Sequence, residues 1–420
     1  MTNHNNKVLA ATAALALTTG LSATTAHAGG FLLNDFGASA TGRANAVTAT
    51  VDDGSAIFYN PAGIGRTKST ASIYVGATGI APYSDFTSEV SGVTTDAEDG
   101  GTVTPHLYAY GTAYKFIKIG VGLTTPFGSS TAWPASSPGR EQSRSASLRT
   151  FFISPVVGLD LSEFVPGNLY VGGGVDFVPA DVELGRDILF GDVVGEALVG
   201  ADAFGLGGRF GVQYEPIEQI SLGVAYRSKV SLDFEGQGDL DIAAPFRAAL
   251  PPDGPVSSAL VLPQSVLFGI AVRPLPNLEI EFNGQWQDWR DLEELTVNFS
   301  DGSASVARYD WNDVLTLRLG AEYKIVEARL TLRAGYAFDP TPYPDTTLGF
   351  APPDADRHNV YLGGNYNFSG GLFLDLGLLY GLPVSSETSE EPLLPQIKGR
   401  FGISFVVAAL SVGFNFGDGS

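Results

Sequence analysis

The sequence predicts an all-β protein, a transmembrane antiparallel β-barrel of about 14 strands. Three observations lead to this prediction. Apolar and polar residues alternate with a period of two, short and long connections alternate, and after the N-terminal leader no stretch approaches the roughly 20 apolar residues of a membrane-spanning helix. Together these features are typical of a barrel in the outer membrane of a Gram-negative cell.

Residues 1 to 28 have the pattern of a signal peptide. Lys7 supplies a positive charge, an apolar run follows it, and Ala26-His27-Ala28 matches a small-residue cleavage site. The run of about 10 apolar residues is too short for a membrane anchor. We therefore expect a mature chain that begins at Gly29.

Composition excludes several classes of function. The chain has 420 residues and a net charge of -21, so it has no basic surface for nucleic acid. It contains no cysteine, which excludes a disulfide framework and thiolate metal sites. With 52 glycines and only 16% charged residues it is unlike most soluble enzymes.

Period-two alternation locates the strands. Residues 278–285 place Leu, Ile and Phe on one face and Glu, Asn and Gln on the other, and residues 317–323, 330–338 and 372–380 alternate similarly. A soluble β-sandwich also alternates in this way. Glycines at the inner positions and aromatic residues at the ends of the apolar face favour a membrane barrel.

Connection lengths give the strand count. About six short turns alternate with about seven long segments, which indicates about 14 strands over residues 70–416, with both termini in the periplasm and a short tail at 417–420. Residues 292–300 are either an additional strand or the upper end of the preceding one. The long segments are 85–103, 127–147, 186–197, 237–261, 290–310, 339–357 and 382–396.

The C-terminal strand carries two signals. Phe416 is similar to the terminal aromatic residue of outer-membrane proteins, so we expect the barrel assembly machinery as a partner. The apolar positions change from odd to even numbers near Ala408-Ala409. This change predicts a β-bulge at that point.

Several motifs in order identify a family. The chain resembles FadL-type outer-membrane transporters of long-chain fatty acids, which include TodX-like importers of aromatic hydrocarbons. The resemblance covers nearly the whole mature chain. Its motifs are residues 29–36 (GGFLLNDF), 42–44 (GRA), 58–63 (FYNPAG), 125–128 (TPFG), 286–289 (WQDW), 317–323 (LRLGAEY) and 352–357 (PPDADR).

The resemblance implies a mechanism. Residues 29–69 would form a plug, or hatch, inside the lumen, and hydrophobic molecules would pass from a groove between outer loops to a lumen site and leave sideways through the barrel wall. The expected protein is a monomer surrounded by outer-membrane lipid, without a cofactor. The alternative is a general diffusion porin or a structural or adhesive barrel.

Candidate ligand-binding residues lie on two loops and in the plug. Phe190 lies in the loop at 186–197, and Phe246 and Leu250 lie in the loop at 237–261. Apolar side chains on outer loops either bind a ligand or pack on one another. The resemblance places Phe31 near the inner site, where it would contact the ligand or act as a strut.

Two arginines are candidates for holding a carboxylate. Arg318 and Arg333 fall on the inferred lumen face, where a guanidinium could clamp a fatty acid with two hydrogen bonds. Lumen acids such as Glu279 and Glu322 offer a structural salt-bridge network instead. We favour the network, because buried charges are usually paired.

Two further sets of residues follow from backbone chemistry. Asn60, Pro61 and Ala62 predict a defined turn that would act as a latch, or gate, in the plug, although a plain structural turn is an alternative. The resemblance implies that the third strand bends and opens the wall sideways, and Gly120, Gly122 and Pro126 would permit such a bend.

Catalytic and metal sites are not predicted. Only His106 and His358 follow the predicted cleavage site, and neither lies in a motif with a nucleophilic serine or in a metal-ligand spacing. The aspartates near residues 52 and 96 lack an EF-hand pattern. We expect a protein that is not an enzyme.

Overall fold

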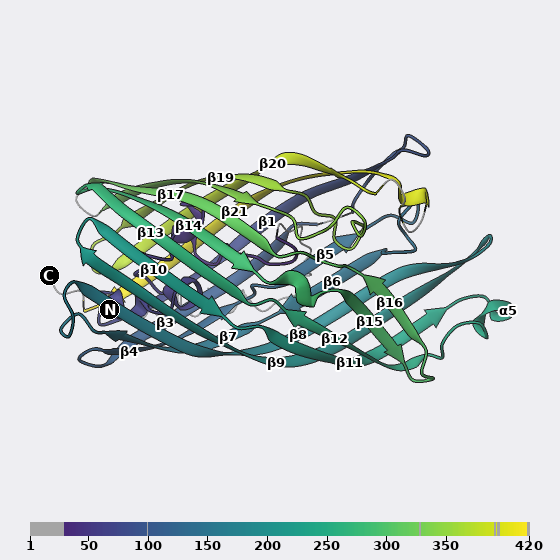
Figure 1. The fold of residues 1–420 in the computed structure, drawn as a ribbon, viewed down its shortest axis with the longest axis horizontal. Coiled ribbons are helices and arrows are strands. Elements are labelled where there is room, and N and C mark those ends of the chain that lie inside the picture. The colour runs from purple at the N-terminus through teal and green to yellow at the C-terminus, as the bar shows by residue number, and fades with distance from the viewer. Residues whose placement is uncertain (1–28, 99, 327–328, 390–391, 393–394, 418–420) are drawn as a thin grey trace, which may run out of the picture.

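The computed structural model describes residues 29–417 apart from 99, 327–328, 390–391 and 393–394. The predicted signal peptide and residues 418–420 of the tail lie outside the described residues. The chain forms a closed antiparallel barrel of 14 strands, which confirms the predicted fold class (Figure 1). Among the described helices, none is long and apolar enough to cross a membrane.

The helices are short and the strands are long. The helical segments are α2 (Ala38–Thr41), α3 (Ala56–Tyr59), α4 (Gly63–Arg66), α5 (Ala244–Arg247), η1 (Trp289–Asp291) and η2 (Pro395–Ile397). The strand segments are β1 (Ala71–Ser88), β2 (Thr94–Asp96), β3 (Thr102–Tyr114), β4 (Ile117–Thr124), β5 (Gly128–Ala132), β6 (Ser145–Thr150), β7 (Phe152–Asp160), β8 (Asn168–Phe190), β9 (Val193–Ile217), β10 (Ile220–Arg227), β11 (Val230–Asp241), β12 (Gly254–Leu262), β13 (Ser265–Leu275), β14 (Leu278–Gln287), β15 (Glu294–Phe299), β16 (Ala304–Arg308), β17 (Val314–Val326), β18 (Leu330–Asp339), β19 (Arg357–Asn367), β20 (Leu372–Glu387) and β21 (Gly399–Phe416).

Short irregular stretches divide several barrel strands into two segments. The pairs β4 with β5, β6 with β7, β10 with β11, β12 with β13, β14 with β15 and β16 with β17 each form one strand. The undivided strands are β1, β3, β8, β9 and β18 to β21, and β2 is a short addition that pairs with β1. The ladder between β1 and β21, from Ala71 opposite Phe416 to Ser88 opposite Gly399, closes the barrel.

Tight turns gather at one end of the barrel, and long hairpins with α5 gather at the other, which we call the loop end (Figure 1). The predicted loop at 186–197 was wrong, because β8 and β9 pair continuously up to Phe190 opposite Val193. Much of 237–261 and 290–310 also belongs to strands, and β15 continues β14. Strand pairing satisfies backbone groups that an open loop would leave to water.

Side chains alternate between the lipid face and the lumen. Leu317, Leu319 and Leu410 point outward and are exposed, as the alternation predicted. The bulge predicted near Ala408 was wrong, because the pairing of β21 with β1 is unbroken. Odd positions of β21 point inward throughout, and the apolar residues at four of them, Phe401, Ile403, Phe405 and Val407, are buried inside the barrel.

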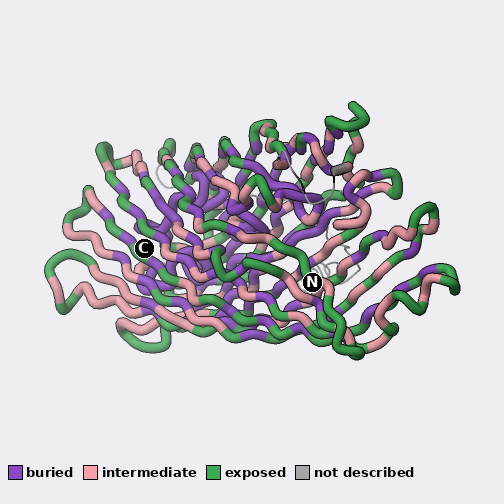
Figure 2. The backbone as a smooth tube through the Cα atoms, turned by 45° about the vertical axis from the view of Figure 1, so that its right-hand side comes forward, coloured by how far each residue is buried: buried purple, intermediate pink, exposed green. Residues whose placement is uncertain are grey.

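The segment that precedes β1 lies inside the barrel. Its helix α2 contacts β19, β20 and β21, and α4 contacts β4, β7 and β8, so the segment crosses the lumen. Lumen glycines permit the close approach: a Cβ added at Gly42 would lie 2.9 Å from the Cα of Gly363. Buried residues accordingly gather in the middle of the barrel, and the loop tips are exposed (Figure 2).

Candidate ligand cavity and plug

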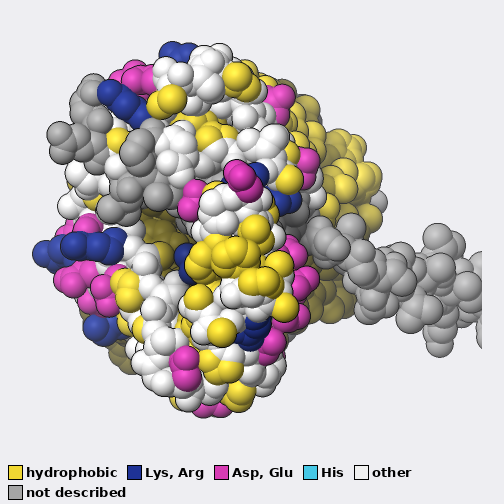
Figure 3. Space-filling view, turned by 90° about the vertical axis from the view of Figure 1, so that its right-hand side faces the viewer, with side chains coloured by type: hydrophobic (Ala, Val, Ile, Leu, Met, Phe, Trp, Pro, Cys, Tyr) yellow, Lys and Arg dark blue, Asp and Glu magenta, His cyan; other side chains and the backbone are white. Residues whose placement is uncertain are grey.

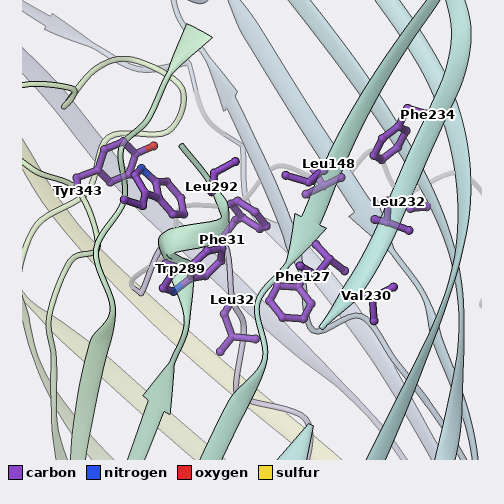
Figure 4. Close-up of a cluster of buried hydrophobic side chains, with 14 of the residues drawn as sticks. Phe31, Leu32, Phe127, Leu148, Val230, Leu232, Phe234, Trp289, Leu292 and Tyr343 are labelled. Atoms are coloured by element: carbon purple, nitrogen blue, oxygen red, sulfur yellow. The ribbon is translucent and has the colours of Figure 1, made fainter. Parts of the chain in front are cut away.

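An apolar cavity of about 90 Å³ lies in the lumen on the loop-end side of the plug. Its side chains come from segments far apart in the sequence, because each barrel strand contributes only every second residue. Figure 4 shows the buried cluster that surrounds it. We call it the inner cavity, and its lining includes Phe31, Leu148, Leu184, Phe234, Leu260, Leu292, Val297, Tyr309 and Trp311.

Phe31 forms part of the wall of the inner cavity. Its ring centroid lies 4.8 Å from that of Trp289 and 5.5 Å from that of Trp311. The backbone on both sides is held as well, since Leu33 N donates to Pro126 O at 2.7 Å and Gly128 N donates to Phe31 O at 3.0 Å. The structure therefore places Phe31 both at the cavity and in a tight aromatic cluster.

A second cavity, of about 350 Å³, lies nearer the loop end. Ile188 and Leu250 line it, and Ala146, Leu184 and Val297 line both this outer cavity and the inner one. Hydrophobic side chains are visible among acidic ones on this end of the molecule (Figure 3). The two cavities therefore share walls along one apolar path.

Two of the loop residues that were predicted to bind a ligand, Phe190 and Phe246, lie outside both cavities. Phe190, at the end of β8, stacks on Phe246 of α5 with ring centroids 5.4 Å apart and planes at 27°. Neither residue lines a described cavity, whereas Leu250 lines the outer one. The two aromatic residues thus pack on each other at the tips of their hairpins.

The turn at residues 60–62 docks against the barrel wall. The Asn60 side-chain amide donates to Thr48 O at 2.7 Å and to the strand carbonyl of Val212 at 3.1 Å, and its Oδ1 accepts from Ala62 N at 3.2 Å. A Cβ added at Gly211 would overlap Asn60 Oδ1, and one at Gly172 would overlap the Pro61 carbonyl. This turn therefore sits on two glycines of the wall.

Lumen arginines are largely neutralised by acids. Arg333 forms ion pairs with Glu322 at 2.8 Å and with Asp375 at 2.7 Å. Arg318 is buried and shares a small polar cavity with two aspartates and another arginine. The two acids neutralise Arg333, in agreement with the network interpretation, whereas Arg318 forms no ion pair among the described residues.

The same polar cavity borders the plug N-terminus. Arg357 and Asp354 form a buried ion pair of 2.6 Å, and Asp354 also accepts hydrogen bonds from Gly30 N at 3.4 Å and from Thr341 Oγ1 at 2.8 Å. Burial raises the pKa of Asp354 to about 6. A loop carboxylate thus helps to hold the first residues of the plug.

The third strand is interrupted at Pro126. Gly120 and Gly122 lie in β4 and pair regularly with β3 and β7, so these two glycines are not at the interruption. The ladder between β3 and β4 ends at Leu107 opposite Leu123, and β5 pairs with β6 but, within the described residues, not with β3. Leu32 of the plug instead forms an isolated bridge with Phe127.

Several residues at these cavities have no local signal in the sequence. Leu148, Leu260 and Trp311 are ordinary apolar residues of three separate segments, and only strand pairing brings them together. Arg227 lines a small cavity beside Pro126 and Phe127.

Among the described residues, no group of three or more His, Cys, Asp or Glu side chains is placed to hold a metal ion.

Comparison with known proteins gives matches along the chain. A family model described as outer membrane protein transport protein (OMPP1/FadL/TodX) matches residues 19–416. The long-chain fatty acid transport protein of Salmonella typhi is 25% identical over 444 residues, which cover 96% of this chain and 99% of that protein. Outer membrane protein P1 of Haemophilus influenzae is 27% identical, with 89% of each chain covered.

Solved structures share the fold. A FadL homologue of Pseudomonas aeruginosa superposes with a TM-score of 0.82 at 18% identity, and the match covers 92% of this chain and 100% of that one. The toluene transporter TodX of P. putida gives a TM-score of 0.71 at 19% identity, with 89% and 98% covered. At these identities the likeness concerns the barrel and not the ligand.

Proposed function

The chain belongs to the outer membrane protein transport family OMPP1/FadL/TodX, and from this premise we propose that it takes up hydrophobic molecules passively across the outer membrane. The main support for this proposal is the apolar path that the outer and inner cavities form. This path ends at Phe31 of the plug. Relatives named for fatty acids and for toluene both fit such a path, because each cargo requires apolar walls.

The exit would be sideways through the barrel wall. Between β3 and β5 no ladder closes the wall in the described residues, and Leu32 of the plug forms an isolated bridge with Phe127 there instead. Movement of residues 31–33 away from Pro126–Gly128 would join the lumen to this gap. Residues 60–62 would hold the rest of the plug in place as a latch.

Other features of the protein follow from the same proposal. No covalent step is needed, so the chain would act as a transporter and not as an enzyme, as its relatives do. A closed barrel has no exposed strand edge, which supports a monomer. We retain the proposal that the assembly machinery recognises the strand that ends at Phe416.

Filling the inner cavity tests the proposal. Leu260 lines that cavity, so Leu260→Trp should lower the uptake of a labelled fatty acid or toluene at least about tenfold in a deletion strain. Leu362→Trp, on the lipid face, is the matched control and should leave uptake unchanged. Equal uptake by both variants would remove the inner cavity from the transport path.

Conductance separates this proposal from a general pore. Because the plug crosses the lumen, the purified protein should conduct ions poorly in planar bilayers. A large steady conductance, together with normal uptake of hydrophobic molecules after deletion of the gene, would favour a diffusion porin.

A further inference from the structure

The first residue of the predicted mature chain is buried inside the lumen. Gly29 follows the predicted cleavage site Ala26-His27-Ala28 directly, and it lies among side chains of the barrel wall. A Cβ built on Gly29 would lie 3.3 Å from Asp339 Oδ1 and 3.5 Å from Gln287 Oε1. The start of the predicted mature chain therefore faces a carboxylate and an amide of the wall.

The next residue, Gly30, holds this position. A Cβ built on Gly30 would lie 2.5 Å from a ring carbon of Trp311 and 2.9 Å from a ring carbon of Trp289. Glycine fits this narrow space because it has no Cβ. Gly30 N also donates to a carboxylate oxygen of Asp354 at 3.4 Å. The two indoles and this hydrogen bond keep the preceding residue beside the wall.

The charges around this position do not balance. The lining of the polar cavity includes the charged residues Asp35, Asp339, Arg318 and Arg357. Arg357 already pairs with Asp354 at 2.6 Å. Arg318 is thus the one cation of this described lining that is left for two aspartates. Neither aspartate forms an ion pair in the described part of the chain, so one carboxylate of the lining lacks a cation.

Removal of the signal peptide would supply the missing charge. A signal peptidase hydrolyses a peptide bond with one water molecule, which here would leave a carboxylate on Ala28 and an amino group on Gly29. In the uncleaved chain the nitrogen of Gly29 is a neutral amide with one N–H group. A free α-amino group is mostly protonated at neutral pH, so it carries a positive charge and three N–H donors.

We propose that the α-ammonium group of Gly29, which signal-peptide cleavage creates, forms a buried ion pair with Asp339 and so fixes the start of the plug in the lumen. After cleavage the nitrogen is free to turn about the Cα–C bond of Gly29 into the position that a Cβ would occupy. From there it faces Asp339 Oδ1 and Gln287 Oε1 at close to the Cβ distances of 3.3 and 3.5 Å. These distances suit an ion pair and a hydrogen bond.

The side chain of Gln287 supports this placement. It belongs to a residue that is 2% exposed, and its Nε2 has no hydrogen-bond partner among the described residues. Buried amides are usually hydrogen-bonded, and an ammonium group on Gly29 would donate to Gln287 Oε1. Cleavage thereby becomes a step in the assembly of the plug, and the chemistry of the cargo plays no part in it.

Acetylation of the N-terminus tests the role of the charge. Mature protein that starts at Gly29 would be refolded in detergent with its α-amine either free or selectively acetylated, and unfolded in urea. Acetylation should raise the equilibrium constant for unfolding of wild type about 100-fold or more, because it leaves a buried carboxylate without its cation. In Asp339→Asn it should change this constant less than about threefold, because the variant has no charge to pair.

Thr316→Val is the matched control. Thr316 Oγ1 donates to Asp339 Oδ1 at 2.6 Å, so this variant disturbs the same side chain and keeps its charge. Its response to acetylation should equal that of wild type. A loss of the response in Thr316→Val would mean that local packing, and not the charge of Asp339, holds the N-terminus.

Labelling of the α-amine is a second readout that needs no variant. In folded wild type, an amine-reactive reagent should modify Gly29 at least about tenfold more slowly than in urea, because a buried and paired ammonium is protected. Mass spectrometry of the same protein, purified from outer membranes, should give the mass of residues 29–420.

Three results would overturn the inference. The first is a purified chain that begins at a residue other than Gly29. The second is labelling of Gly29 at the same rate in the folded and the unfolded protein. The third is an equal effect of acetylation in wild type and Asp339→Asn, which would trace the effect to the bulk of the acetyl group. The proposed uptake of hydrophobic molecules would stand in each case.

Discussion

Leu32 of the plug and Phe127 of the third strand face each other in an isolated antiparallel bridge. The hydrogen bonds come from the flanking residues, which makes Leu32 and Phe127 a closely spaced, non-hydrogen-bonded pair. The plug thus supplies strand pairing at the place where the wall itself is interrupted. This relationship connects the inner cavity, which Phe31 lines, with the gap in the wall.

A disulfide should lock this contact. Opposed residues of such a pair have Cα atoms about 4.5 Å apart, within the range for a disulfide, and the chain has no cysteine of its own. We expect Leu32→Cys with Phe127→Cys to reduce uptake several-fold under oxidising conditions and to recover with a reductant. The single-cysteine variants should not respond. Full uptake by a cross-linked protein would show that residues 31–33 need not leave the wall.

A larger side chain at Gly211, where the barrel wall contacts Asn60, should displace residues 60–62. A side chain at Gly211 overlaps Asn60, whereas a Cβ at Gly200 of the same strand meets nothing within 4 Å. We expect Gly211→Val to assemble but to raise ion conductance and sensitivity to large antibiotics, and Gly200→Val to behave like wild type. Identical conductance of the two variants would argue against a role of residues 60–62 in sealing the lumen.

Arg333 should contribute to stability more than to ligand choice. Arg333→Met leaves Asp375, whose side chain is 2% exposed, without its cation, which should cost about 3 to 5 kcal/mol in the free energy of unfolding. Arg308→Met, at an exposed ion pair, should cost less than about 1 kcal/mol. Urea titration of the folded band measures both. A loss of oleate binding at unchanged stability would restore Arg333 as a ligand clamp.

Asp354 predicts a pH dependence of stability. Burial raises its pKa to about 6 from an ordinary value of 3.8, so between these values the folded chain holds a proton that the unfolded chain has released. Its contribution is present below about pH 4 and is lost as the pH rises through 6. Relative to Asp354→Asn, wild type should lose about 3 kcal/mol between pH 4 and 7.

Unfolding of both proteins across this pH range measures the difference. A constant difference, or one that grows in favour of wild type at higher pH, would mean that the ion pair of 2.6 Å with Arg357 outweighs the burial of Asp354.

Sequence patterns predicted the structure correctly where the type of a residue decides which face of the barrel wall it occupies. Alternation at residues 278–285 and 372–380 predicted strands, because a barrel wall has only two faces. The separate prediction of a loop at 186–197, which rested on polar and glycine-rich composition, was wrong, because the structure has paired strands there. Local composition does not reveal whether a neighbouring strand is present to accept the hydrogen bonds.

The sequence by itself determined the barrel, its approximate strand count and the family, since periodicity and motif order are properties of the chain alone. Only the tertiary structure decided which arginines are neutralised. Arg333 and Arg227 look equivalent in the sequence, yet one faces two acids and the other faces a carbonyl and an aromatic ring. The reason is physical: the effect of a buried charge depends on distances to groups that strand register and the docked plug bring together.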